Sequence, residues 1–154
     1  MRNLSEIINN SKSYKASTPP WELKTPIIDT GLTRIINKEA DKFKNKTITE
    51  EYIEHYLANS LSIYTDGSRD VNGDIGAGIV IPELKVRSHL KLDNNVSVFT
   101  AEIVAILKAF EIIEEKASDK CTIFTDSLSS IQALENRNKN TRPDLIEKIL
   151  IIKY

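Results

Sequence analysis

Three acidic residues, Asp66, Glu102 and Asp126, occupy positions in the sequence where carboxylates could hold metal ions. Asp66 follows the alternating run LSIYT and Asp126 follows the similar run CTIFT, so each is expected at the carboxyl end of a strand. If the two strands are parallel neighbours, both side chains open into the crevice where α/β sheets bind ligands. With a third carboxylate from an adjacent helix, they could coordinate two Mg²⁺ ions about 3.5–4 Å apart and support hydrolysis without a covalent intermediate.

Glu102 is the candidate for that third carboxylate, because it lies in a segment with helical periodicity. On the helical wheel it falls at the edge of the apolar stripe, with the small residues Ala105 and Ala109 beside it. A carboxylate in this position is half buried and needs a partner that offsets the cost of its desolvation. A metal ion would be such a partner.

Each carboxylate also has a simpler interpretation. Asp66 precedes Gly67 and could be a turn residue, and Asp126 precedes a helical segment and could be its N-cap. Glu102 could merely complement the helix dipole. Residue spacing alone leaves these alternatives open, although all three positions are compatible with one shared site.

The surrounding sequence predicts the elements that would position the carboxylates. Alternating β-rich runs separated by turn residues predict three antiparallel strands and a later fourth strand, at residues 61–66, 73–82, 86–92 and 121–126. Helical spacing predicts helices at residues 99–116, 127–135 and 144–152, with Ser97 as N-cap of the first and Pro143 in the first turn of the last. The order strand, helix, strand, helix implies a parallel pair within a mixed α/β sheet. The glycines of GDIGAG are interpreted as strand or bulge positions, because they do not follow the dinucleotide-binding pattern.

The N-terminal part of the chain is expected to contribute little to the core. Residues 1–46 are polar and contain three prolines, which is typical of a linker with short ordered pieces. A short helix is predicted from Thr49 to about Asn59. We therefore expect a connector at residues 1–60 and one α/β domain at residues 61–154.

Composition limits the classes of function. The chain has 154 residues, of which 28% are charged and 40% hydrophobic, and no apolar run long enough to cross a bilayer, so no membrane partner is expected. The N-terminus has no signal-peptide core and Cys121 is the only cysteine, which favours an intracellular protein without deciding between cytoplasm and nucleus. One cysteine and two histidines cannot form a zinc cage, so oxygen ligands and hard cations are expected. The net charge of −1 and the lack of a Lys/Arg run argue against strong independent nucleic-acid binding.

Three motifs, YTDGS (residues 64–68), TAEIVAI (100–106) and FTDSLSSIQAL (124–134), resemble the successive motifs of type 1 ribonuclease H domains. Their amino-acid sequences are most similar to the ribonuclease H region that follows the reverse transcriptase in non-LTR retrotransposon polyproteins. PPWELKTPIIDTGL (residues 19–32) resembles the connector between those two domains. The similarity covers roughly residues 19–154.

This resemblance implies a ribonuclease-H-like fold that cleaves the RNA strand of an RNA–DNA hybrid endonucleolytically. Asp66, Glu102 and Asp126 would be the catalytic residues and the ligands of two Mg²⁺ ions, with Mn²⁺ as an alternative, and Asp66 would bridge both ions. Gly67 and Ser68 would bring the backbone close to the hybrid, while Thr100 and Ser127 would touch sugar or phosphate. A neighbouring reverse transcriptase domain is the implied protein partner.

The sequence departs from the family pattern at its C-terminal end. Family members continue into a fifth strand, a His-containing loop and a last helix with a fourth metal-binding Asp, whereas this sequence stops at Tyr154. The expectation is a domain without its last strand and helix, with one weakly bound ion and little activity. Neither Asp144 nor His89 replaces the missing residues, and His89 is interpreted as an ordinary sheet residue. The alternative function is a non-catalytic or degenerate module of a retroelement polyprotein.

Overall fold

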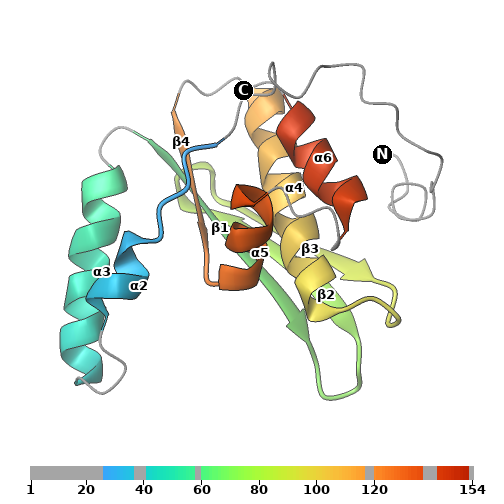
Figure 1. Cartoon of the computed structure of the whole chain (residues 1–154), viewed down its shortest axis with the longest axis horizontal. Helices are drawn as coiled ribbons and strands as arrows, with labels where there is room; N and C mark the ends of the chain where they lie inside the picture. The colour runs from blue at the N-terminus through green and yellow to red at the C-terminus, as the bar shows by residue number, and fades with distance from the viewer. Residues whose placement is uncertain (1–25, 37–40, 58–59, 117–119, 137–141, 153–154) are drawn as a thin grey trace.

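The computed structural model describes residues 26–36, 41–57, 60–116, 120–136 and 142–152. In these residues a four-stranded sheet is combined with helices that precede and follow it (Figure 1). The strands are β1 (Leu61–Arg69), β2 (Ile75–Ile81), β3 (Val86–Leu92) and β4 (Cys121–Thr125), and a short 3-10 turn, η1 (Pro82–Leu84), links β2 to β3. The helices are α2 (Gly31–Ile35), α3 (Lys42–Leu57), α4 (Val98–Lys116), α5 (Leu128–Glu135) and α6 (Pro143–Ile151).

The sheet has the strand order β3-β2-β1-β4. β1 and β2 pair antiparallel, as do β2 and β3, whereas β4 lies parallel to β1. This arrangement confirms the predicted mixed α/β sheet of three antiparallel strands followed by a parallel strand. The connection from β1 to β4 runs through β2, β3 and the long helix α4, because parallel neighbours cannot be joined by a tight turn.

Helix α4 forms the centre of the core. It packs against β1 and β2, and α5 and α6 in turn pack against α4 (Figure 1). The inward residues of the strands and the apolar stripe of α4 are almost completely buried, as Ile63, Ile79 and Ile103 illustrate. Each such side chain contributes about 1.5–3 kcal/mol when it leaves water. The hydrophobic effect therefore fixes α4 against the inner face of the sheet.

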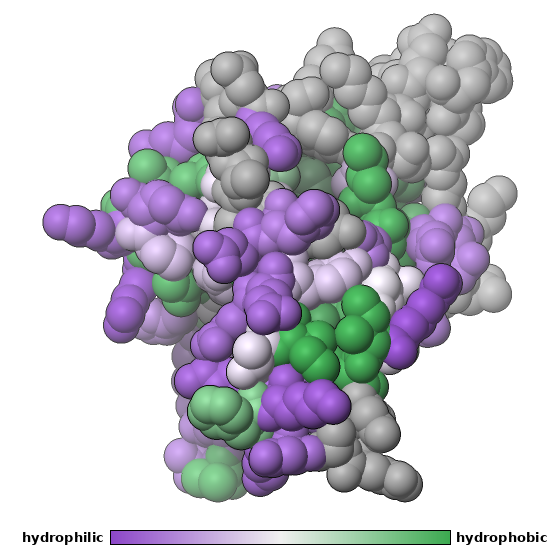
Figure 2. Space-filling view, turned by 90° about the vertical axis from the view of Figure 1, so that its left-hand side faces the viewer, coloured by the Kyte–Doolittle hydropathy of each residue, from purple (hydrophilic) through white to green (hydrophobic). Residues whose placement is uncertain are grey.

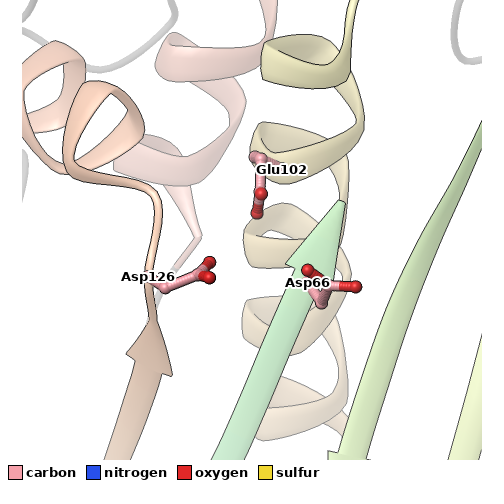
Figure 3. Close-up of side chains that lie close together, drawn as sticks. All are labelled: Asp66, Glu102 and Asp126. Carbon is pink, nitrogen blue, oxygen red and sulfur yellow. The ribbon is translucent and has the colours of Figure 1, made fainter. Parts of the chain in front are cut away.

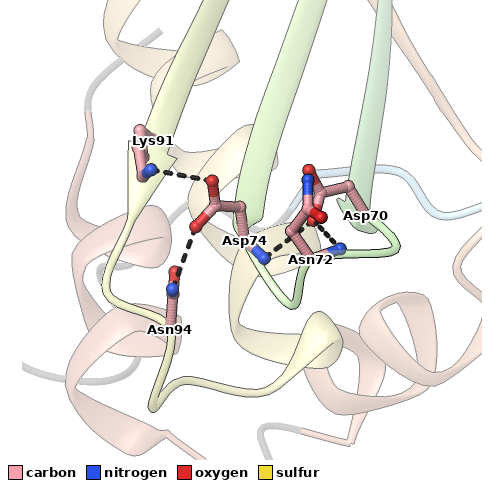
Figure 4. Close-up of polar contacts among 5 residues, drawn as sticks. All are labelled: Asp70, Asn72, Asp74, Lys91 and Asn94. Atoms are coloured by element: carbon pink, nitrogen blue, oxygen red, sulfur yellow. Dashed lines mark hydrogen bonds and ion pairs between the residues drawn. The ribbon is translucent and has the colours of Figure 1, made fainter.

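The β1–β2 connection differs from the prediction. The sequence predicted that the first strand would stop at Asp66–Gly67, but β1 continues to Arg69 and the turn lies at residues 70–74. There, Asp70 Oδ1 accepts hydrogen bonds from the backbone N–H groups of Asn72 and Asp74, at 2.8 and 2.9 Å (Figure 4). Gly73 takes the positive φ of 87° that the turn needs. The chain therefore turns at Asp70–Gly73, four residues after the predicted turn at Asp66–Gly67.

Helices α2 and α3 lie on the β4 side of the sheet in Figure 1 and contact each other. Asp29 joins them, since its Oδ1 accepts hydrogen bonds from Gly31 N at 2.6 Å and from the Tyr52 hydroxyl at 2.9 Å. The prediction that the helix begins at Thr49 was wrong: α3 begins at Lys42, and the Thr49 hydroxyl donates back to the Asn45 carbonyl within the helix. Of the predicted linker at residues 1–46, residues 1–25 and 37–40 lie outside the described residues, whereas α2 and the start of α3 lie within the predicted range.

The side of the molecule that carries α2 and α3 exposes hydrophilic side chains with separate apolar patches among them (Figure 2). Several large apolar side chains of this N-terminal part are exposed, including Ile27, Ile35 and Phe43. Within the described residues, no helix combines the length and the apolar character that crossing a membrane requires.

Candidate metal and active site

The parallel register of β1 and β4 brings two of the predicted carboxylates side by side. The paired residues run from Leu61 opposite Cys121 to Thr65 opposite Thr125, so Asp66 and Asp126 are the next residue on each chain. Asp66 lies inside β1, because β1 continues along β2 after β4 has ended. The interpretation of Asp66 as a turn residue was therefore wrong, although Asp66 does stand at the end of the parallel ladder.

The N-cap interpretation of Asp126 was also wrong. Ser127 caps α5, because its Oγ accepts a hydrogen bond from Ser130 N. Asp126 remains exposed between β4 and the helix. Its carboxylate is thus available for another role.

Glu102 comes to the site from the fifth residue of α4. The predicted cap is confirmed, since Ser97 Oγ accepts a hydrogen bond from Thr100 N at 3.1 Å and begins the helix just before Val98. Gly67 sets the depth of the helix on the sheet: a Cβ at this position would lie 2.9 Å from the Ala101 carbonyl carbon and would overlap the backbone of Glu102. The absence of a side chain at Gly67 therefore allows α4 to approach β1 closely.

The three carboxylates converge at one place, as Figure 3 shows. One oxygen each from Asp66, Glu102 and Asp126 lies within 4.8 Å of the others. The two aspartates are exposed, whereas Glu102 is buried, with 7% of its surface accessible. In the described part of the chain these three form the group whose atoms could surround a metal ion.

Glu102 shows most clearly what such a site needs. Its Oε2 atom is buried and has no hydrogen-bond partner among the described residues. The pKa of Glu102 is raised from 4.5 to about 7. Burial is the main cause, a hydrogen bond from the Gly67 backbone partly offsets it, and the negative charges of Asp126 and Asp66 add to the rise. A cation bound among the three would supply the missing partner and remove the repulsion between like charges.

This donor set fits a hard divalent cation. Carboxylate oxygens are the ligands that Mg²⁺ and Mn²⁺ prefer, and two exposed carboxylates leave coordination positions open to water and substrate. Asp144, by contrast, holds Arg142 through two hydrogen bonds, at 2.9 and 2.7 Å. Its charge is already compensated by that pair, and it lies outside the group of three carboxylates.

A comparison with models of protein families places this chain in a family. A family model described as RNase H matches residues 58–150, which is more than half of the chain. The chain belongs to the RNase H family. A search of curated proteins returned no match.

Solved RNase H structures resemble parts of this domain. The N-terminal RNase H domain of a Mycobacterium tuberculosis protein, solved as a fusion with maltose-binding protein, is 18% identical and has a TM-score of 0.42; the match covers 58% of this chain and 70% of that chain. LC11-RNase H1, isolated from compost by a metagenomic approach, is 28% identical with a TM-score of 0.40; the match covers 59% and 71% of the two chains.

In the RNase H domain, the predicted substrate-binding residues differ in exposure and in hydrogen bonding. Ser68 is exposed on the outer face of β1, on the same side as Asp66. Thr100 is buried and shares a hydrogen bond with Ser97, while the Ser127 hydroxyl lies 2.7 Å from that of Ser130. Both of these side chains are engaged at helix N-termini next to the carboxylates. Their contacts with a substrate remain a prediction.

The sequence interpretation missed the part that Gly67 plays in the RNase H domain. It assigned Gly67 to a turn or to substrate contact, whereas the structure packs this glycine against the backbone of α4. A glycine inside a β-rich run is a signal of close approach by another backbone, and that signal was available in YTDGS. The substrate contact of Gly67 remains untested.

Proposed function

We propose that this RNase H domain hydrolyses the RNA strand of RNA–DNA hybrids, with Asp66, Glu102 and Asp126 as the ligands of two divalent cations. The observation that carries the proposal is the buried, unpartnered oxygen of Glu102, which lies beside two exposed carboxylates in a chain of the RNase H family. Three carboxylates so close together are mutually destabilising unless a cation neutralises them. Mg²⁺ is the proposed ion, and Mn²⁺ is an alternative.

Each residue of the site has its own role in the proposed reaction. Divalent cations bound there would neutralise the charge of the scissile phosphate and lower the pKa of a water molecule. Asp66 has a carboxylate oxygen within 4.8 Å of an oxygen of both other residues, and it is proposed to ligate both ions. Glu102 offers a buried carboxylate next to the Gly67 backbone, and Asp126 offers one from the opposite side. Ser68, Thr100 and Ser127 are proposed to contact the sugar–phosphate backbone.

A strand-specific cleavage assay tests this proposal. The full chain is incubated with an RNA–DNA hybrid that carries a different fluorophore on each strand, in MgCl₂ and in EDTA. The expected result is internal cleavage of the RNA strand alone, which requires Mg²⁺ and falls to background in the Asp126→Asn variant. Asp144→Asn is the matched control, because that aspartate lies outside the carboxylate group, and it should cleave like the unchanged protein. Equal cleavage by the unchanged chain and Asp126→Asn would contradict the proposal.

We also propose that residues 1–60 connect this domain to a neighbouring one, a reverse transcriptase in a retroelement polyprotein. The support comes from the exposed apolar side chains Ile27, Ile35 and Phe43, which an adjacent domain would cover. If the domain serves only for such docking, the full chain would bind a partner and show no Mg²⁺-dependent cleavage. The assay above separates the two functions.

A further inference from the structure

The outer face of the sheet, opposite α4, begins at the candidate site. Along β2, the inward residues Ile75, Ala77, Ile79 and Ile81 are buried, and the residues between them, Gly76, Gly78 and Val80, point to the other face. The strand register places Gly78 beside Asp66 and Gly76 beside Ser68. A row of two glycines therefore borders the carboxylate site on its β2 side.

The fold does not require glycine at these two positions. A Cβ at Gly76 would meet its nearest atom, the Leu90 carbonyl oxygen, at 3.5 Å, and a Cβ at Gly78 would meet the Asp66 carbonyl oxygen at 3.8 Å. Both distances are ordinary van der Waals contacts, and neither glycine has a positive φ. Glycine weakens a strand relative to other residues and often marks a place where a ligand approaches the backbone. Gly76 and Gly78 thus leave the outer face next to Asp66 without side chains, although the packing of the domain does not require glycine there.

Basic side chains lie on β3, on the side of these two glycines away from β1. On β3, Arg87 pairs with Val80, His89 with Gly78 and Lys91 with Gly76, so all three point to the outer face, and all three are exposed. We call Arg87, His89 and Lys91 the β3 basic row. Its members are about 7 Å apart along the strand, and the row lies about 10 Å from β1 across two strand spacings. The spacing along the row is of the order of the phosphate repeat of a nucleic-acid strand.

The members of the β3 basic row differ in how far their charge is already compensated. Lys91 Nζ contacts Asp74 Oδ2 at 2.9 Å, and Asp74 also accepts from Asn94 (Figure 4). The hydrogen bonds from Lys91 and then Asn94 lower the pKa of Asp74, so that carboxylate stays charged and holds Lys91. Arg87 and His89 have no such partner among the described residues. Arg87 is the strongest free cation of the row.

We infer that the sugar–phosphate backbone of the hybrid crosses the outer face over Gly76 and Gly78, and that Arg87 and His89 hold its phosphates. The inference rests on the proposed function for its choice of the hybrid as the ligand. Charge complementarity selects a polyanion, since Arg binds phosphate through two parallel hydrogen bonds and His donates one more. Because Gly76 and Gly78 have no side chains, a sugar–phosphate strand can lie close to the sheet between the β3 basic row and the carboxylates.

The strand geometry also explains why no run of basic residues marks this surface. Nucleic-acid-binding proteins often carry runs of Lys and Arg and a positive net charge, whereas this chain has a net charge of −1. The β3 basic row occupies every second residue of VRSHLKL, so its charges are separated by Ser88 and Leu90 in the sequence. They come together only because a strand sends alternate side chains to the same face.

Fluorescence anisotropy with a labelled RNA–DNA hybrid tests the inference. The Asp126→Asn chain in MgCl₂ serves as the reference, so that the hybrid stays intact during the measurement. Adding Arg87→Gln should weaken binding about tenfold, because a charged hydrogen bond is lost. It should also reduce the slope of log affinity against log salt by about 0.9, the value for one phosphate contact.

Two further variants make the test specific. Lys46→Gln removes the same charge from the exposed surface of α3 and should leave affinity and slope unchanged. The double variant Gly76→Ala/Gly78→Ala, which the fold has room for, should weaken binding severalfold while its thermal unfolding midpoint stays near that of the reference.

The result that overturns the inference is an Arg87→Gln chain that binds the hybrid with the affinity and salt slope of the reference. Failure of the reference chain to bind the hybrid at all would also overturn it. If the unchanged chain does not cleave the hybrid but Arg87→Gln still weakens binding, the proposed catalytic function fails and the binding surface stands. The two proposals can therefore be refuted separately.

Discussion

Replacing Glu102 with Gln should stabilise the metal-free protein at alkaline pH. In the folded protein, burial and the charges of Asp126 and Asp66 raise the pKa of Glu102 from 4.5 to about 7. Between these two pH values the unfolded chain releases the proton of Glu102, whereas the folded chain keeps it. The contribution of Glu102 to the stability of the folded state is therefore fully present below pH 4.5 and is lost as the pH rises through 7.

The size of the effect follows from the pKa difference. Each pKa unit corresponds to about 1.4 kcal/mol, so the contribution of Glu102 to the free energy of unfolding falls by about 3 kcal/mol across this range. Glutamine has nearly the same shape and cannot ionise. The Glu102→Gln variant should therefore match the unchanged protein at pH 4.5 and exceed it by up to about 3 kcal/mol at pH 8.

Urea unfolding in EDTA, followed by circular dichroism at both pH values, measures this difference. Glu114→Gln is the matched control, because Glu114 is exposed on the same helix, and it should change the free energy of unfolding equally little at both pH values. The account of Glu102 would be refuted by a Glu102→Gln variant that is less stable than the unchanged protein at pH 8. It would also be refuted by a stability difference that does not depend on pH.

Two further predictions concern the elements that hold the site. Gly67→Ala should lower the free energy of unfolding by about 1–3 kcal/mol, because its Cβ overlaps the α4 backbone. Gly78→Ala, with its nearest contact at 3.8 Å, should change it far less, and urea unfolding of the two variants measures the difference. Ser97→Ala should cost about 1 kcal/mol through the lost N-cap of α4, measured in the same way, and a cost no greater than that of an exposed Ser→Ala change would contradict the cap.

The sequence predicted the sheet and its helices well, because periodicity and turn residues carry that information directly. The strand at 86–92 has the predicted bounds, α4 and α6 lie within a residue or so of their predictions, and Ser97 is the cap. The grouping of the three carboxylates in space followed from one assumption, that the first and fourth strands are parallel neighbours, and the structure confirms that pairing. The roles of these residues in metal binding and catalysis remain predictions.

Other features depend on tertiary packing and could not be obtained from local patterns. Asp-Gly at residues 66 and 67 has the composition of a turn, but the contact of Gly67 with α4 and the pairing with β2 carry the strand further. The early start of α3 at Lys42 was missed because its sequence has little apolar periodicity. The β3 basic row was missed because its charges alternate with other residues and meet only on the folded sheet.

The central claim is that Asp66, Glu102 and Asp126 together hold divalent cations. Anomalous diffraction from a crystal of the full chain soaked in MnCl₂ locates those ions directly. The account predicts a strong anomalous peak at coordination distance, about 2.0–2.2 Å, from carboxylate oxygens of all three residues, and the loss of that peak in Asp126→Asn crystals. Ordered carboxylates with no anomalous peak between them, or a peak held by other residues alone, would contradict it.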